Sequence, residues 1–239
     1  MNRLLQDWVT HQAKVRPDAI AIVSGDEKLS YGELEKLSNQ LAHTLRDGGC
    51  KSGDRVCLLM PKSVAAVVSM IGVLKAGCMH VPIDTASPAA RIRQILASCQ
   101  NRWILAAGPV GPLLDELLAD DSLGSTISVG SLDPQPIATQ RTKPSFTRAD
   151  LVLAPSTPLA QDRAPQDGAH ILFTSGSTGV PKGVVITHSN VSAFVAWALK
   201  HFGIDHTDRF SGHTPFHFDL STFDIFGSLT AGAQLHLVP

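Results

Sequence analysis

Short apolar segments of strand type alternate with longer helical segments over residues 55–129, and this alternation limits the fold more than any other feature. Proline or glycine closes several of these segments, as at Pro61 and Gly77. Strands are predicted at 55–60, 80–83, 103–106 and 126–129, and helices at 63–76, 89–98 and 113–119. Strands joined by helices run parallel, so we predict an α/β fold with mostly parallel sheets flanked by helices.

Helix and strand signals also occur on either side of this stretch, from residue 30 to residue 238. Ser30 and Glu33 have the S-x-x-E spacing of a capping box, in which a hydroxyl and a carboxylate bind free amides at a helix start. Leucines at helical spacing follow them, so a helix is predicted there. Ser87 and Ser189 are expected to cap the helices that follow each of them. Beyond residue 129, strands are predicted at 169–173, 184–187, 209–213 and 235–238, and helices at 190–202 and 221–229.

Ten residues rich in glycine and hydroxyl groups separate the strands predicted at 169–173 and 184–187. Their sequence is Thr174-Ser175-Gly176-Ser177-Thr178-Gly179-Val180-Pro181-Lys182-Gly183. Glycines allow backbone amides to turn inward, while the hydroxyls and Lys182 add donors and positive charge. These features predict a loop that binds an anion such as polyphosphate. It is not the common P-loop, where Ser or Thr follows the lysine and a helix begins, because Gly183 and β-branched residues follow here.

A plain solvated turn between two strands is the alternative for this loop. Glycine and serine are frequent in such turns, and turn preference is the whole support for that interpretation. Turns rarely combine Pro-Lys-Gly with Ser-Gly-Ser-Thr-Gly, as residues 175–183 do. The anion-binding interpretation is therefore favoured.

The charge balance argues against two classes of partner. The chain has 20 basic and 21 acidic residues, a net charge of −1, and no block of five basic residues. Nothing therefore indicates a nucleic acid or a membrane surface as partner. The longest apolar run, 64–74, is too short to span a bilayer, and the N-terminus lacks the apolar core of a signal peptide. A soluble cytoplasmic protein is the expectation.

Metal binding is not indicated by the cysteine or histidine spacing. The chain has four widely spaced cysteines: Cys50, Cys57, Cys78 and Cys99. They form no C-x-x-C pair, so buried reduced thiols are expected rather than a zinc site. His213 and His217 have the i, i+4 spacing of a zinc-binding helix, but Pro215 between them would break that helix. We predict no metal site within this sequence.

Residues 131–168 interrupt the alternation of strands and helices. This segment has almost no apolar periodicity and contains six prolines: Pro134, Pro136, Pro144, Pro155, Pro158 and Pro165. A connection of this length without secondary structure is unusual in a compact fold. We therefore expect a Pro-rich variable connection, part of which is mobile or lies over the surface.

Three further segments resemble a known family in the same order along the chain. They are Leu29-Ser30-Tyr31-Gly32-Glu33-Leu34, the segment 74–84 that ends in Val81-Pro82-Ile83-Asp84, and Phe218-Asp219-Leu220-Ser221. With the loop at 174–183 as the third, they are similar to the first four core motifs of nonribosomal peptide synthetase adenylation domains, within the adenylate-forming superfamily. The second segment departs from the family pattern only at Cys78, Met79 and His80. One short motif alone is weak evidence, but four in order over residues 29–226 are specific.

The resemblance implies the N-terminal αβ subdomains of the adenylate-forming fold and a reaction that uses ATP with Mg²⁺. In that family a carboxylate attacks the α-phosphate of ATP, and the acyl group then passes to the phosphopantetheine thiol of a carrier protein. The implied ATP-binding residues are Thr174, Ser175, Gly176, Ser177, Thr178, Gly179, Lys182 and Gly183. Lys182 and Thr174 are the candidate catalytic residues, because a cation and hydroxyls neutralise charge on the leaving phosphates.

The resemblance also implies an amino-acid substrate. Asp219 matches the family aspartate that pairs with the α-ammonium group, a charge-assisted contact that selects against plain fatty acids. Phe218 matches the aromatic residue on the carboxylate side of the pocket. Leu220 and Phe223 fall at positions that wall the side-chain pocket, and they would suit a small or apolar amino acid.

Several of these assignments have structural alternatives. Asp219 could instead cap the helix that follows it. Leu220 and Phe223 could be ordinary core residues. His188, where the family also carries histidine, is either a buried structural residue or a general base, and the first is favoured.

Later motifs of the family do not occur before residue 239, including the glutamate that binds magnesium and the C-terminal lysine. The resemblance therefore implies that residues 1–239 are the N-terminal portion of an adenylation domain, with the C-terminal domain absent. We expect little or no adenylation activity from this portion alone. An acyl- or aryl-acid ligase and a non-catalytic nucleotide-binding module remain as alternatives.

Overall fold

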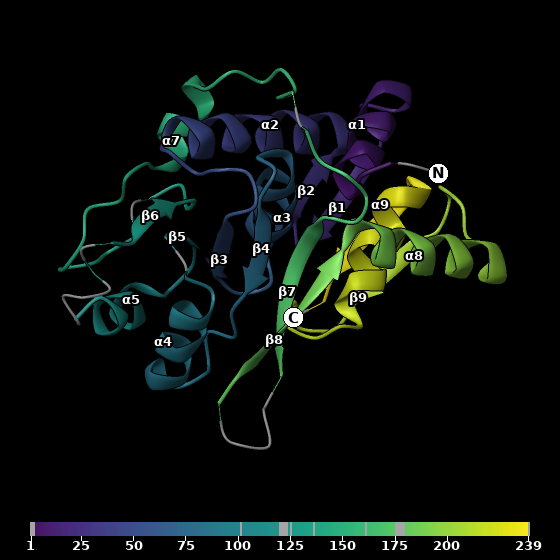
Figure 1. Cartoon of the computed structure of the whole chain (residues 1–239). Coiled ribbons are helices and arrows are strands. Elements are labelled where there is room, and N and C mark those ends of the chain that lie inside the picture. The colour runs from purple at the N-terminus through teal and green to yellow at the C-terminus, as the bar shows by residue number, and fades with distance from the viewer. Residues whose placement is uncertain are drawn as a thin grey trace.

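A computed structural model describes residues 3–100, 102–119, 124, 126–135, 137–160, 162–174 and 180–238. Within these residues the strands form two sheets, with the orders β6-β5-β3-β4-β7-β8 and β2-β1-β10-β9 (Figure 1). The strands of the larger sheet are β3 (Arg55–Leu59), β4 (Met79–Pro82), β5 (Trp103–Ala106), β6 (Ser128–Ser131), β7 (Gly168–Thr174) and β8 (Lys182–Thr187). The strands of the smaller sheet are β1 (Ile20–Ser24), β2 (Glu27–Ser30), β9 (Arg209–Gly212) and β10 (Gln234–Leu237).

Both sheets are mostly parallel, as the alternation of elements predicts. In the larger sheet β3 to β7 pair in parallel, and only β8 runs antiparallel, as the second strand of a hairpin with β7. In the smaller sheet β10 lies parallel to both β1 and β9, whereas β2 is antiparallel to β1. The predicted α/β fold class is confirmed.

Helices cover both faces of the larger sheet. The helices are α1 (Leu5–Val15), α2 (Tyr31–Asp47), α3 (Val64–Lys75), α4 (Ala89–Ser98), α5 (Gly111–Leu117), α7 (Arg148–Leu153), α8 (His188–Phe202), the π-helix η1 (Phe223–Gly227) and α9 (Ser228–Ala231). Side chains of β3 alternate between two cores, because successive residues of a strand point to opposite faces. Val56 and Leu58 pack in the core of α2 and α3, and Cys57 and Leu59 in that of α4 and α5. No helix in the described part of the chain is long and apolar enough to cross a membrane.

The structure confirms one of the three predicted helix N-caps and contradicts the other two. The Ser30 hydroxyl accepts from the Glu33 amide at 3.2 Å, and the Glu33 carboxylate accepts from the Ser30 amide at 2.8 Å, so this capping box is confirmed. The Ser87 prediction is wrong, because Pro88 is the N-cap of α4 and the Ser87 hydroxyl donates to Asp84. The Ser189 prediction is also wrong. Thr187 caps α8, where its hydroxyl accepts from the Asn190 amide at 3.1 Å.

The described residues of the Pro-rich connection, 131–168, include a helix and buried side chains that its sequence pattern does not indicate. It contains α7, and four of its apolar side chains are buried: Leu132, Ile137, Phe146 and Leu151. Phe146 pairs with Gly130 at the end of β6 and lies 6.1 Å from the Trp103 ring. These side chains are too far apart in the sequence to give a periodic signal.

Candidate functional site

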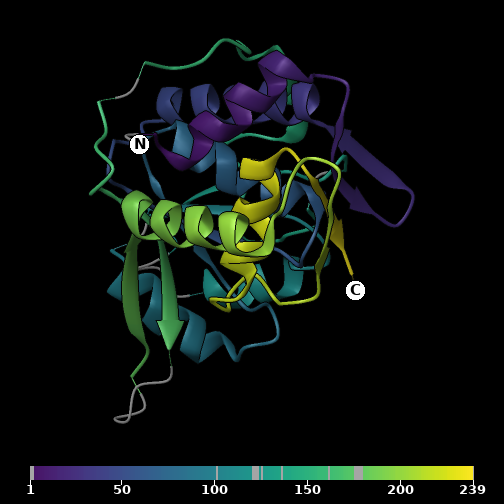
Figure 2. The same cartoon turned by 90° about the vertical axis from the view of Figure 1, so that its right-hand side faces the viewer.

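A pocket of about 540 Å³ lies between the β7–β8 hairpin, the start of α4 and the segment before η1. Its lining comprises Pro82, Asp84, Ser87, Arg91, Ile95, Leu172, Phe173, Thr174, Val184, Ile186, His217, Phe218 and Asp219. The carboxyl ends of the parallel strands β4 and β7 meet at this edge of the sheet, where α/β proteins commonly bind ligands. Figure 2 shows the β7–β8 hairpin extending from the body below α8.

Three of the predicted site residues meet in this pocket. Thr174, at the end of β7, lines it together with Phe218 and Asp219 from a segment more than forty residues later. This convergence follows from the topology, because the segment before η1 returns to the edge at which β7 ends. Hydroxyl, aromatic and carboxylate groups therefore share one cavity with apolar walls.

Asp219 is exposed and stands in the turn that precedes η1. Its backbone carbonyl accepts from the Thr222 amide at 3.0 Å, whereas its carboxylate makes no hydrogen bond or ion pair with any described residue. Ser221 does not cap the following helix either, because its hydroxyl donates to the Phe218 carbonyl at 2.6 Å. The capping alternative for Asp219 thus has no hydrogen bond to support it. The carboxylate is free to bind a ligand.

The hairpin places Thr174 directly opposite Lys182. The two residues are register partners, and the Thr174 hydroxyl lies 3.5 Å from the Lys182 carbonyl. Gly183 is opposite Phe173, and a Cβ atom there would lie 2.9 Å from the Ile171 side chain. A glycine thus allows close packing where the hairpin leaves the sheet. The remaining predicted loop residues lie outside the described residues: Ser175, Gly176, Ser177, Thr178 and Gly179.

The two predicted side-chain wall residues lie apart from the pocket in the described chain. Leu220 is 71% exposed. Phe223 packs against Phe194 and Phe210, with ring centroids 5.7 Å and 5.4 Å away. The assignment of Leu220 and Phe223 to substrate binding stays a prediction, and Lys182 likewise stands outside the lining of this pocket.

Arg91 is a pocket residue that sequence reasoning missed. It lies in the first turn of α4, is half-buried, and makes no ion pair with any described residue. Its neighbour in the lining, Asp84, is already bound within its own turn by the Ala86 amide at 3.0 Å and the Ser87 hydroxyl at 3.1 Å. The pocket thus contains the charges of Arg91, Asp84 and Asp219, and Arg91 and Asp219 make no hydrogen bond or ion pair through their charged groups with any described residue. A single arginine on an amphipathic helix resembles an ordinary solvated charge in the sequence.

His188 lies away from this pocket, at the start of α8. It is buried, and its Nδ1 atom accepts a hydrogen bond from the Leu5 amide at 3.3 Å. Burial lowers the pKa of His188 to about 4, and Arg163 acts in the same direction while Asp167 opposes it. The ring is neutral at pH 7 and holds α1 against α8. This geometry favours the structural interpretation over the general base.

Two mostly parallel sheets flanked by helices, with a charged pocket at the carboxyl ends of β4 and β7, define an α/β protein of the adenylate-forming fold class. The sequence model of the AMP-binding enzyme family matches residues 9–239, so the chain belongs to that family. The resemblance based on the four motifs is thereby confirmed.

Relatives of known name are identical to this chain at about a third of the aligned positions. L-proline–[L-prolyl-carrier protein] ligases from Streptomyces coelicolor and Pseudomonas fluorescens are 34% and 35% identical over 90% and 99% of the chain. The chain spans 40% and 45% of these two relatives. Tyrocidine synthase 1 of Brevibacillus parabrevis is 32% identical over 95% of the chain, which spans 19% of that protein.

Solved structures share the fold over the whole chain. The nonribosomal peptide synthetase FmoA3, in an alpha-methyl-L-serine-AMP bound form, has a TM-score of 0.80 at 29% identity and covers 100% of this chain, which in turn covers 24% of it. A long-chain-fatty-acid CoA ligase from Rhodopseudomonas palustris has a TM-score of 0.85 at 20% identity over 98% of this chain and 57% of its own. The second likeness concerns the fold alone.

Proposed function

We propose that the protein containing this chain activates an amino acid with ATP as aminoacyl-AMP and passes it to the phosphopantetheine thiol of a carrier protein. The observation that carries the proposal is the pocket in which Thr174 meets Phe218 and Asp219. An amino acid has both an ammonium and a carboxylate group, and this pocket offers the opposite charges of Asp219 and Arg91. The names of relatives that join L-proline to a prolyl-carrier protein support the same substrate class.

Each residue of the site has a defined task in this proposal. Asp219 binds the α-ammonium group by a charge-assisted hydrogen bond and orients the substrate carboxylate. Phe218 covers the carboxylate side of the substrate. The hydroxyl of Thr174 and the ammonium of Lys182 compensate the charge of the β- and γ-phosphates, together with the predicted donors at 175–179. Pyrophosphate departs from the hairpin end of the site.

ATP enters this reaction as a substrate with Mg²⁺. The hairpin carries a hydroxyl and an exposed cation, which fits an anionic phosphate chain. The described residues hold no group of three or more His, Cys, Asp or Glu side chains that could bind a metal ion. We expect the magnesium ligand in the part of the relatives that this chain does not span. Because ATP and carrier thiols are its co-substrates, we place the reaction in the cytoplasm.

Replacing Asp219 by Ala should lower kcat/KM for the amino acid by about 100-fold, or roughly 2.7 kcal/mol, because the ammonium group loses its charged partner. The measurement is amino-acid-dependent ATP–pyrophosphate exchange, across a panel of amino acids, with residues 1–239 and with a chain extended to the length of the ligases. Asp219→Asn separates charge from shape, and Lys182→Ala tests the phosphate side. Asp26→Ala, at the exposed turn between β1 and β2, is the control for net charge.

We expect exchange only in the extended chain, for one or two amino acids, and its loss in Asp219→Ala but not in Asp26→Ala. Equal loss in both variants would contradict the role of Asp219. Exchange by residues 1–239 alone would overturn the prediction that later motifs are needed. If the extended chain shows no exchange with any amino acid but does show it with acyl or aryl acids, the proposed substrate class is wrong.

A further inference from the structure

The fold brings the four distant cysteines together as two pairs. The Sγ atoms of Cys50 and Cys78 are 3.2 Å apart, although 28 residues separate them in the chain. Cys57 and Cys99 form the second pair, in which each side chain shifts the pKa of the other. All four are free and buried thiols, which agrees with the prediction from their spacing.

Matching helix ends produce the first pair. Gly49, after α2, has φ +92°, and Gly77, after α3, has φ +75°, conformations that favour glycine. The amide of Cys50 then donates to the Leu45 carbonyl at 2.9 Å, and that of Cys78 donates to the Val73 carbonyl at 3.0 Å. This six-to-one hydrogen bond is the Schellman pattern of helix termination. Because α2 and α3 pack side by side, two equivalent caps set the thiols in contact.

Hydrogen bonds give the two thiols different roles. Cys78 donates its thiol hydrogen to the Lys51 carbonyl at 3.2 Å, and this assignment leaves Cys50 as the donor of the hydrogen bond between the two thiols. The hydrogen bond from Cys50 lowers the pKa of Cys78, Arg46 and Arg163 add to this effect, and burial and Asp54 oppose it. Cys78 is therefore the sulfur that loses its proton first. Cys50 keeps its proton, since its pKa is raised by the bond to Cys78 and by burial.

A cavity of about 360 Å³, the basic cavity, lies beside the backbone that leads into Cys78, and its charged lining residues are Arg46, Lys75, Arg163 and Asp162. Gly77 and Ala76, the residues before Cys78, form part of its wall, together with Arg46 and Arg163. Arg46 is exposed and makes no ion pair with any described residue, so its charge is available to an anion in this cavity. The cavity lies at the ends of α2 and α3 that precede the parallel strands, at the opposite edge of the sheet from the proposed substrate pocket.

We propose that Cys50 and Cys78 are a redox-modification site, a dithiol that closes to a disulfide by exchange with a small anionic disulfide held in the basic cavity. The Cys78 thiolate attacks one sulfur of the external disulfide and releases one thiolate, which takes up a proton. Cys50 then attacks the Cys78 sulfur of the mixed disulfide, and its proton goes to the second leaving thiolate. The external disulfide is reduced to two thiols while the two cysteines are oxidised.

The test treats the folded chain with oxidised glutathione, which is anionic, or with cystamine, which is cationic, at equal concentration. Alkylation, digestion and mass spectrometry then identify the linked cysteines. We expect a Cys50–Cys78 link that forms roughly 3- to 10-fold faster with oxidised glutathione, an advantage that Arg46→Ala and high salt reduce. The link should raise the Tm by roughly 5–10 °C, reversibly on reduction.

Single variants test the order of the two steps. Cys50→Ser should stop at a mixed disulfide on Cys78, whereas Cys78→Ser should accumulate none at Cys50. The Cys57→Ser/Cys99→Ser variant removes the other pair and should leave the Cys50–Cys78 link unchanged. Circular dichroism verifies that each variant is folded. A link that forms only in urea, or first between Cys57 and Cys99, would overturn the proposal, and equal rates with both disulfides would overturn the role of the basic cavity.

Discussion

Replacing Glu35 by Gln is expected to lower the free energy of unfolding by about 3–5 kcal/mol, because it leaves the Lys75 ammonium without its buried partner. The Lys75 Nζ atom lies 2.5 Å from Glu35 Oε2, and the two side chains are 5% and 15% exposed. Burial lowers the pKa of Lys75 to about 8, and Glu35 opposes that shift. The ammonium group therefore depends on the carboxylate to remain charged inside the protein.

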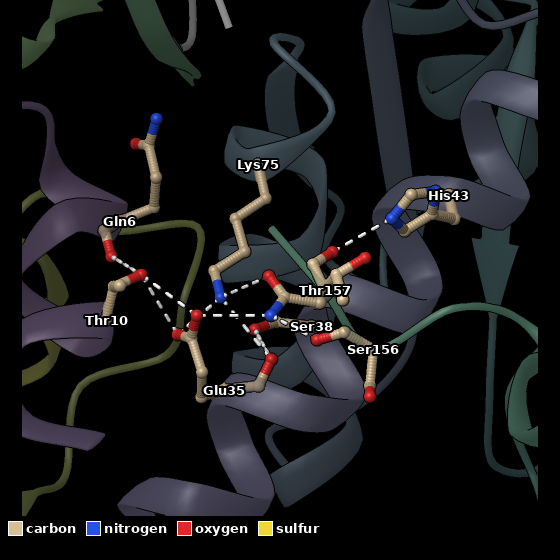
Figure 3. A network of polar contacts seen from close by, with 9 residues as sticks. Gln6, Thr10, Glu35, Ser38, His43, Lys75, Ser156 and Thr157 are labelled. Atoms are coloured by element: carbon tan, nitrogen blue, oxygen red, sulfur yellow. Dashed lines mark hydrogen bonds and ion pairs between the residues drawn. The ribbon is translucent and has the colours of Figure 1, made fainter. Parts of the chain in front are cut away.

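The polar network around this ion pair joins four segments of the chain (Figure 3). Lys75, at the end of α3, also donates to Asn39 Oδ1 at 2.7 Å. From α1, the Thr10 hydroxyl donates to Glu35 at 3.0 Å, and Asn39 donates to the Ser156 carbonyl of the Pro-rich connection at 2.8 Å. Loss of the carboxylate thus affects the packing of α1, α2, α3 and the connection together.

Urea unfolding followed by circular dichroism measures the effect. Lys75→Met should cost a similar amount, whereas the double variant Glu35→Leu/Lys75→Met should recover most of the stability, since an apolar pair leaves no buried charge. Glu116→Gln is the control, because Glu116 faces Arg93 at 3.9 Å in an exposed pair and should change the free energy by less than about 1 kcal/mol. A Glu35→Gln variant as stable as Glu116→Gln would contradict the prediction.

Local signals in the sequence predict most elements of the fold. The capping box at Ser30, the glycines after α2 and α3, and the apolar strands β3 and β5 each depend on near neighbours, which the sequence displays directly. Strand order depends on distant contacts. The pairing of β1 with β10 joins Ile22 to Leu235, and no pattern within either strand indicates that partner.

The candidate site also contains some residues that the sequence predicts and others that only the fold reveals. Thr174 and Asp219 belong to motifs whose residue types indicate their chemistry, and the fold brings them to one pocket. The sequence does not indicate a role for Arg91 or for the Cys50–Cys78 pair, because that role depends on residues that only the fold brings near them. His80 departs from the family motif, and the sequence alone does not indicate what this departure changes. In the structure, His80 is one of three buried histidines.

Weak acid is expected to destabilise the chain strongly, because three buried histidines lie close together. His80 and His170 are register partners of β4 and β7, and their rings stack with centroids 5.1 Å apart. Phe226 stacks on His170 at 6.3 Å. Both ring nitrogens of His80, and Nδ1 of His170, find no hydrogen-bond partner among the described residues.

Burial keeps all three rings neutral in the folded chain. It lowers the pKa of His170 and of His188 to about 4, and that of His80 well below its ordinary value, with the neighbouring histidines adding to the effect on His80 and His170. Between pH 6.5 and 4 the unfolded chain therefore binds more protons than the folded one, so stability falls as the pH falls. For His170 alone, the pKa shift lowers the free energy of unfolding by about 3 kcal/mol once the pH has fallen below the folded pKa.

His80→Phe is the substitution that separates this explanation from general acid lability. It retains an aromatic ring for the stack, and it removes both a titrating group and a buried N–H without a partner. We expect a gain of about 1–2 kcal/mol at pH 7 and a smaller loss of stability between pH 6.5 and 4, measured by urea unfolding at several pH values. His206→Phe, at an exposed turn, should leave the pH profile unchanged. If His80→Phe and the parent chain lose stability in parallel between pH 6.5 and 4, protonation of His80 does not contribute to the acid lability.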